Sequence, residues 1–133
     1  MSNVIDPLQA LLGASTNVEK DVYISRLGAN FRIKALDTDS LNKAREQATH
    51  YIGKGSKREA VTDNTKLHAI LITKLAVAPD FTNKALHEKY GVSNSVDCVQ
   101  KALLPGEVAK LIAEGWKLSG FDDDEDAIDE IKN

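Results

Sequence analysis

The chain has 133 residues, which is the usual size of one domain. Hydrophobic residues make up 42% and charged residues 28%, so the collagen-like, low-complexity and wholly disordered classes are excluded. The formal net charge is −3, but it is unevenly spread: residues 121–133 hold seven acidic residues against one lysine. Such a block is typical of a solvated tail, or of a tail that folds on a basic partner surface.

The sequence has no feature of a secreted or membrane protein. The longest apolar stretch, at residues 69–78, is interrupted by Lys74, and it is much shorter than the roughly 20 residues that cross a membrane. The first residues lack the basic region of a secretory signal. The single cysteine, Cys98, excludes a disulfide within one chain. We therefore expect a cytoplasmic protein without a membrane partner.

Residues 1–20 predict a short apolar helix followed by a linker. Large apolar residues recur at helical spacing before Gly13, which can end the helix, and these residues are Ile5, Leu8, Leu11 and Leu12. Residues 14–20 are mostly small or polar, as in a linker. Such an arm can pack on its own domain or fit a groove on another chain. Because so small a domain offers the stripe no obvious partner, we expect the arm to make the protein a homo-oligomer.

A β-hairpin is expected at the start of the domain, which we place at residues 21–121. Residues 21–25 and 31–36 are rich in β-branched and aromatic residues, and both segments alternate in polarity. Phe31 and Ile33 share one strand face. Since a lone hairpin is only marginally stable in water, it must pack on helices or pair with another strand, and we expect this face to meet the helical layer. We predict no second hairpin.

The rest of the domain has helical periodicity, with capping residues, prolines and glycines at the expected ends. Five helices are predicted, at residues 38–52, 63–78, 82–90, 95–103 and 105–119. The first four have as candidate N-caps Thr38, Thr62 or Asp63, Thr82, and Ser93 or Ser95. Gly120 is expected to take a left-handed conformation that folds Phe121 back onto the last turn. The predicted fold is α+β, mainly α, with a small N-terminal β-hairpin packed on a bundle of about five helices and an acidic tail at residues 122–133.

No group of residues supports catalysis, a metal site or a cofactor. No histidine lies three or four residues from another histidine or from Cys98, so no helical ligand pair exists. Cys98 lies among apolar helix residues and is expected to be a small buried side chain. The basic segment 53–58 lacks the spacing of a phosphate loop, and we expect a solvated loop there, with a phosphate or nucleic-acid contact as the alternative. The protein is therefore not expected to be an enzyme.

Four sequence blocks, taken in order, resemble one protein family. They are FRIKAL at 31–36, APDF and LHEKYG within 78–91, LLPGE at 103–107, and LSGF at 118–121 followed by acidic residues. Their order and spacing are similar to those of the XkdN-like tail assembly chaperones of long-tailed phages and prophages. The resemblance extends over residues 22–133.

The resemblance implies a non-enzymatic protein that acts in the bacterial host cytoplasm during tail assembly. Such chaperones are thought to bind the long, helical, aggregation-prone tape measure protein until the tail tube polymerises around it. A groove or an arm that covers apolar helix stripes suits this task. The candidate partner-binding residues are Ile5, Leu8, Leu11, Leu12, Trp116 and Phe121. The alternative for the last helix is that its apolar stripe, which includes Trp116, belongs to the core.

Two other functions stay open at this point. One is a minor structural or connector protein of a phage tail. The other is a small helical DNA-binding regulator, built on the short helix, the turn at Gly91 and the helix that follows. That second helix offers no arginine to read a guanine, so we expect no nucleic-acid partner.

Overall fold

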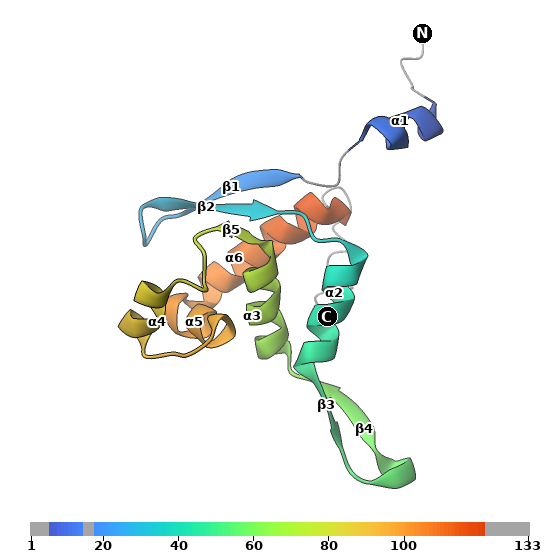
Figure 1. Ribbon diagram of the computed structural model, residues 1–133, viewed down its shortest axis with the longest axis vertical. Helices are drawn as coiled ribbons and strands as arrows, with labels where there is room; N and C mark the ends of the chain where they lie inside the picture. The colour runs from blue at the N-terminus through green and yellow to red at the C-terminus, as the bar shows by residue number, and fades with distance from the viewer. Residues whose placement is uncertain (1–5, 15–17, 122–133) are drawn as a thin grey trace.

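The computed structural model describes residues 6–14 and 18–121, and Figure 1 shows the arrangement of their elements. Within these residues the chain forms six α-helices, five short strands and two brief helical turns. A small sheet lies at one end of the helical layer, and α1 (Pro7–Gly13) stands apart from both. The predicted class is confirmed: the fold is α+β and mainly helical, with an N-terminal hairpin packed on five helices.

The predicted hairpin becomes the main part of a three-stranded antiparallel sheet. Strands β1 (Glu19–Ile24) and β2 (Ala29–Lys34) pair along their whole length, and Gly28 supplies a positive φ of 61° in the turn between them. Strand β5 (Ala76–Ala78) adds to the free edge of β2, which corrects the prediction of a helix continuing to residue 78. The sheet order is β1-β2-β5, so the marginal hairpin is stabilised on one edge by a third strand.

One face of the three-stranded sheet packs on the hydrophobic core. Phe31 and Ile33 are 5% and 0% exposed, as their shared strand face predicted. Phe31 meets the ring of Phe81 edge-on, with 6.3 Å between the ring centroids. Beneath the sheet lies α3 (Asn64–Leu75), the most deeply buried helix, whose buried residues are Ala69, Ile70, Leu71, Ile72 and Leu75. The helical layer and the sheet therefore share a single apolar core.

A second hairpin corrects the sequence prediction for residues 49–62. Helix α2 (Thr38–Ala48) ends at Ala48 rather than continuing to residue 52. Strands β3 (Thr49–Ile52) and β4 (Glu59–Thr62) then pair antiparallel around the turn η1 (Gly55–Lys57). The run Thr-His-Tyr-Ile favours a strand because β-branched and aromatic residues lose side-chain freedom in a helix. In Figure 1 this hairpin projects away from the body below α2 and α3.

The helix N-caps are mostly one residue away from the predicted positions. Asp37 caps α2, Asn83 caps α4 (Lys84–Tyr90) and Asn94 caps α5 (Ser95–Ala102). Asp63, one of the two predicted candidates, caps α3. In every case an Asp or Asn side chain accepts a hydrogen bond from a backbone N–H of the first turn, because the short side-chain oxygen reaches that N–H well. Gly91, with φ of 66°, ends α4 as predicted.

The last helix, α6 (Pro105–Trp116), continues into a short π-helical turn at Lys117–Phe121. Gly120 has φ of 107°, which lets the chain fold back. Phe121 then packs edge-on against Trp116, with 5.6 Å between the ring centroids. Both features agree with the prediction for this end of the helix. The Ser119 hydroxyl also accepts a hydrogen bond of 2.9 Å from the backbone N–H of Leu36, which ties the turn to the chain after β2.

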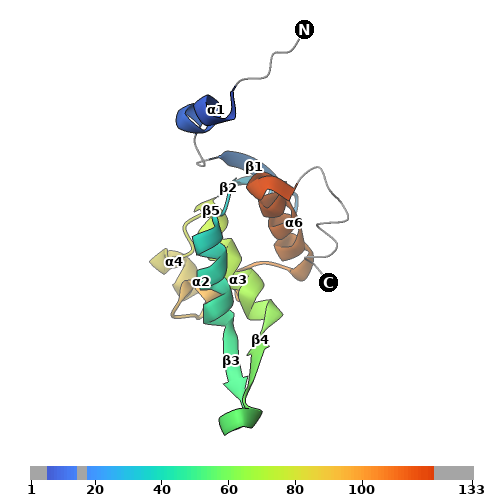
Figure 2. The same cartoon turned by 90° about the vertical axis from the view of Figure 1, so that its right-hand side faces the viewer.

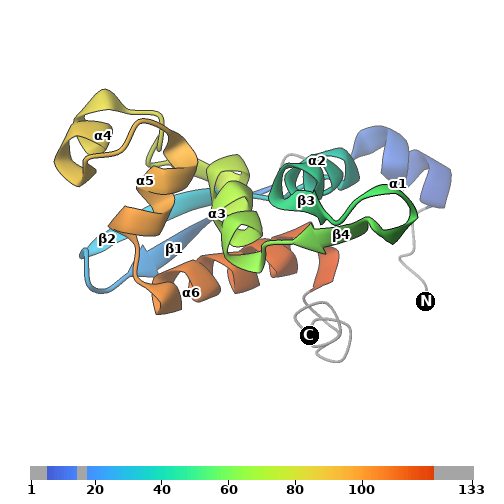
Figure 3. The same ribbon diagram turned by 90° about the horizontal axis from the view of Figure 1, so that it is seen from below.

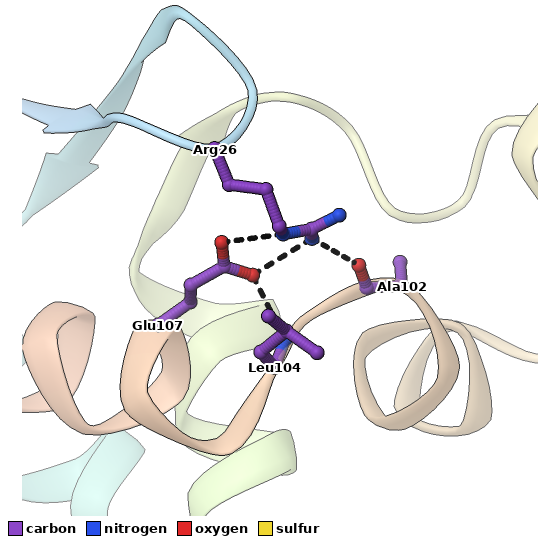
Figure 4. Close-up of polar contacts among 4 residues, drawn as sticks. All are labelled: Arg26, Ala102, Leu104 and Glu107. Carbon is purple, nitrogen blue, oxygen red and sulfur yellow. Dashed lines mark hydrogen bonds and ion pairs between the residues drawn. The ribbon is translucent and has the colours of Figure 1, made fainter.

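Polar contacts fasten α6 to the first hairpin. Glu107 accepts two hydrogen bonds of 2.7 Å from Arg26, which lies in the β1–β2 turn, and one of 2.8 Å from the backbone N–H of Leu104 (Figure 4). Arg26 also donates to the carbonyl of Ala102, at the end of α5. Glu107 therefore caps α6 and joins the hairpin turn to the α5–α6 junction.

We expect Glu107→Gln to lower the melting temperature by a few degrees at pH 7. Glutamine keeps an acceptor for the Leu104 N–H but loses the ionic contact with Arg26. Hydrogen bonding to Arg26 lowers the pKa of Glu107 from its ordinary value of 4.5. A carboxyl group whose pKa is lowered in the folded state stabilises the fold at pH values above its ordinary pKa. This stabilisation is lost as the pH falls through the lowered pKa. The gap between parent and variant should therefore narrow below pH 4.5, and thermal melts across this range will test it. A gap independent of pH would contradict the ionic contribution.

Candidate partner-binding surface

A groove opens between four helices of the domain. Its volume is about 940 Å³, and its walls come from α2, the N-terminal half of α3, the end of α5 and one face of α6. The large aliphatic and aromatic side chains that line it are those of Leu41, Leu67, Leu71, Val99, Leu103, Val108, Ile112 and Trp116. We call this feature the helical groove. Figure 3 views the molecule from below and shows how α2, α3, α5 and α6 are arranged.

The helical groove is apolar in its floor and weakly basic at its rim. Arg45 and His68 lie on its walls and are exposed, and no Asp or Glu stands among the described residues that line it. Ala109 is an exposed small residue on the α6 wall. A groove of this chemistry suits an amphipathic helix that brings apolar residues on one face and acidic residues at its edges.

Helix α1 is a second apolar surface. None of its residues is buried, and Leu8, Leu11 and Leu12 are 64%, 76% and 76% exposed. These leucines share one helical face because they stand three and four positions apart. Figure 2 shows α1 beyond the sheet, away from the body of the domain.

The structure separates the predicted partner-binding residues into two groups. Trp116, only 9% exposed, lines the helical groove and packs against half-buried Phe121. The leucines of α1 lie elsewhere, and Ile5 lies outside the described residues, as does the predicted acidic tail at 122–133. Trp116 thus belongs both to the core and to the wall of a groove.

The sequence did not reveal the walls that α2, α3 and α5 contribute. The signal for α3 was present, since the segment from Ala69 to Leu75 is apolar around most of the helix, which is typical of a helix packed on several sides. The pattern does not say which helices are its neighbours. The second hairpin was also missed, and it exposes Tyr51, whose ring centroid lies 4.2 Å from the Arg58 guanidinium carbon.

Other expected features can be placed in the fold. Cys98 is fully buried, as predicted, and burial raises the pKa of its thiol. Across residues 6–14 and 18–121, no three His, Cys, Asp or Glu side chains gather closely enough to hold a metal ion. None of the helices in this part of the chain has the length and apolar character needed to cross a bilayer.

The chain folds as a small, mainly helical α+β domain with an apolar groove between its helices, and comparison with known proteins places it in a family. The model of the Phage XkdN-like tail assembly chaperone protein family matches residues 8–132. The chain therefore belongs to the XkdN-like phage tail assembly chaperone family.

A relative and a solved structure agree with this assignment. The uncharacterized protein YqbN of Bacillus subtilis (strain 168) is 30% identical over 106 residues, which cover 77% of this chain and 71% of YqbN. A crystal structure of the protein YqbN superposes with a TM-score of 0.61 at 20% identity, covering 89% of this chain and 99% of that one. The superposition shows that the fold is shared.

Proposed function

We propose that this protein is a non-enzymatic tail assembly chaperone that binds the tape measure protein of its phage or prophage. It would act in the cytoplasm of the bacterial host. Membership of the XkdN-like family supports the role in tail assembly. In this proposal residues 21–121 form the binding domain, and residues 1–20 and 122–133 are its appendages.

The helical groove is the observation that carries the proposal. A tape measure protein is a long helical chain, and its apolar stripes need cover before assembly. The groove offers Leu67, Val108 and Ile112 to such a stripe, and helix-in-groove recognition relies on this kind of apolar floor. Arg45 and His68 at the rim favour acidic residues beside the stripe. The groove therefore favours an amphipathic helix with acidic flanks.

A charged residue on the groove wall should weaken tape measure binding about tenfold or more, because the apolar stripe of the bound helix would desolvate the carboxylate. The change is Ala109→Glu, at an exposed site on α6. The matched control is Ala85→Glu, at an exposed helical alanine on α4 that does not line the groove. Isothermal titration with a purified helical fragment of the cognate tape measure protein gives the dissociation constants.

Two results would contradict the proposal at different levels. If Ala109→Glu and Ala85→Glu bind equally well, the helical groove is not the binding site. If the parent protein does not bind any fragment of its cognate tape measure protein, the function itself is wrong.

A further inference from the structure

Helix α1 is folded but has no packing partner among the described residues. An isolated helix of seven residues is marginal in water, and helices of this size normally gain their stability from packing of an apolar face. Here that face, made by Leu8, Leu11 and Leu12, is the most exposed group of large apolar side chains in the described chain. Leucines spaced in this way are the anchors of helix-in-groove recognition.

The same chain carries a groove that lacks a helix. The helical groove has a volume of about 940 Å³, its apolar lining is mostly aliphatic, and its only charged or titratable side chains among the described residues are Arg45 and His68. The segment from Asp6 to Ala14 has no basic residue and one acidic residue, so its entry into the groove meets no like-charge repulsion. Helix α1 and the helical groove are therefore complementary: an apolar helix face matches an apolar groove, and an acidic residue matches a weakly basic rim.

We propose that α1 of one copy docks in the helical groove of a second copy. Figures 1 and 2 show α1 on the far side of the three-stranded sheet from α2 and α3, which favours a groove on another molecule over its own. Exchange about a two-fold axis buries both arms in both grooves, and this closes the assembly at a dimer. The inference needs only this chain and does not depend on tape measure binding.

Sedimentation velocity on the full-length protein tests the exchange. The parent is expected to be a concentration-dependent dimer, and Leu11→Glu should raise the dissociation constant about tenfold or more. Ala10→Glu is the matched control, because it places the same charge on the opposite face of α1. Ala109→Glu should weaken the dimer from the groove side, with Ala85→Glu as its control.

Mixing the two weakened variants makes the test specific. Leu11→Glu keeps an intact groove and Ala109→Glu keeps an intact arm, so an equal mixture should form a heterodimer through one arm–groove contact. The only tryptophan of the chain, Trp116, lines the groove and reports its occupancy. Its emission should change when the parent is diluted, and Leu11→Glu should already show the emission of the diluted parent.

Three outcomes would overturn the inference. The first is a parent that stays monomeric at all concentrations. If the Trp116 emission of such a monomer still responds to Leu11→Glu, the arm occupies the groove of its own chain, and the exchange between copies is wrong. The second is a dimer that Leu11→Glu and Ala10→Glu leave equally stable. The third is a mixture of the two weakened variants that forms no heterodimer.

Discussion

Replacing Phe31 with aspartate is expected to remove most of the free energy of unfolding at room temperature. The ring is 5% exposed and contacts Phe81 under the sheet. Losing a buried aromatic side chain costs roughly 3–5 kcal/mol, and burying a carboxylate without a partner adds several more. Because small domains are stable by only about 5–15 kcal/mol, this one change can remove most of the free energy of unfolding. Urea denaturation followed by circular dichroism measures it.

Tyr23→Asp is the control for this change. Tyr23 lies on the neighbouring strand β1 but is 53% exposed, so the same kind of substitution should cost about 1 kcal/mol or less. If Phe31→Asp has the same urea denaturation midpoint as the parent, then packing of this sheet face on the core contributes little to stability.

Trp116→Ala should produce the second largest loss of stability. The side chain is buried at the end of α6, and its removal leaves Phe121 without its aromatic partner. Truncating a buried tryptophan costs roughly 3–5 kcal/mol, which corresponds to a fall of roughly 10–20 °C in melting temperature for a domain of this size. Differential scanning calorimetry gives the value directly.

Trp116→Phe keeps an aromatic ring against Phe121 and should recover much of the loss. The pair of variants separates packing from any role in partner contact. If Trp116→Ala melts within a degree or two of the parent, then Trp116 contributes little to the core and serves the groove alone.

Local patterns predicted the first hairpin and most helix positions. Alternation over Phe31 and Ile33, the proline at the start of α6 and the glycine after α4 each act within a few residues, so the sequence shows them directly. The error at β3 arose because Ile52 stands four residues after Ala48 and continues the apolar spacing of α2. Strand preference in Thr49–Ile52 and pairing with β4 outweighed that spacing.

The arm of the candidate site was predictable and the groove was not. The exposure of Leu8, Leu11 and Leu12 depends on a stripe that lies within one short segment. The helical groove depends on how α3 and α6 pack with α2 and α5, which lie far apart in the sequence. Periodicity identifies an apolar face but does not identify the face that meets it.

The contacts between α6 and the first hairpin bear on how the protein is made. Glu107, Glu114 and Lys110 on α6 bond with Arg26, Lys20 and the carbonyl of Tyr23, across sequence separations of 81 to 94 residues. Chains grow from the N-terminus at a pace far slower than hairpin formation. Strand β1 therefore leaves the ribosome long before the helix that fastens it, and completion of the domain waits for translation to pass α6. The arm is synthesised before β1, so its leucines are exposed to the cell throughout that interval.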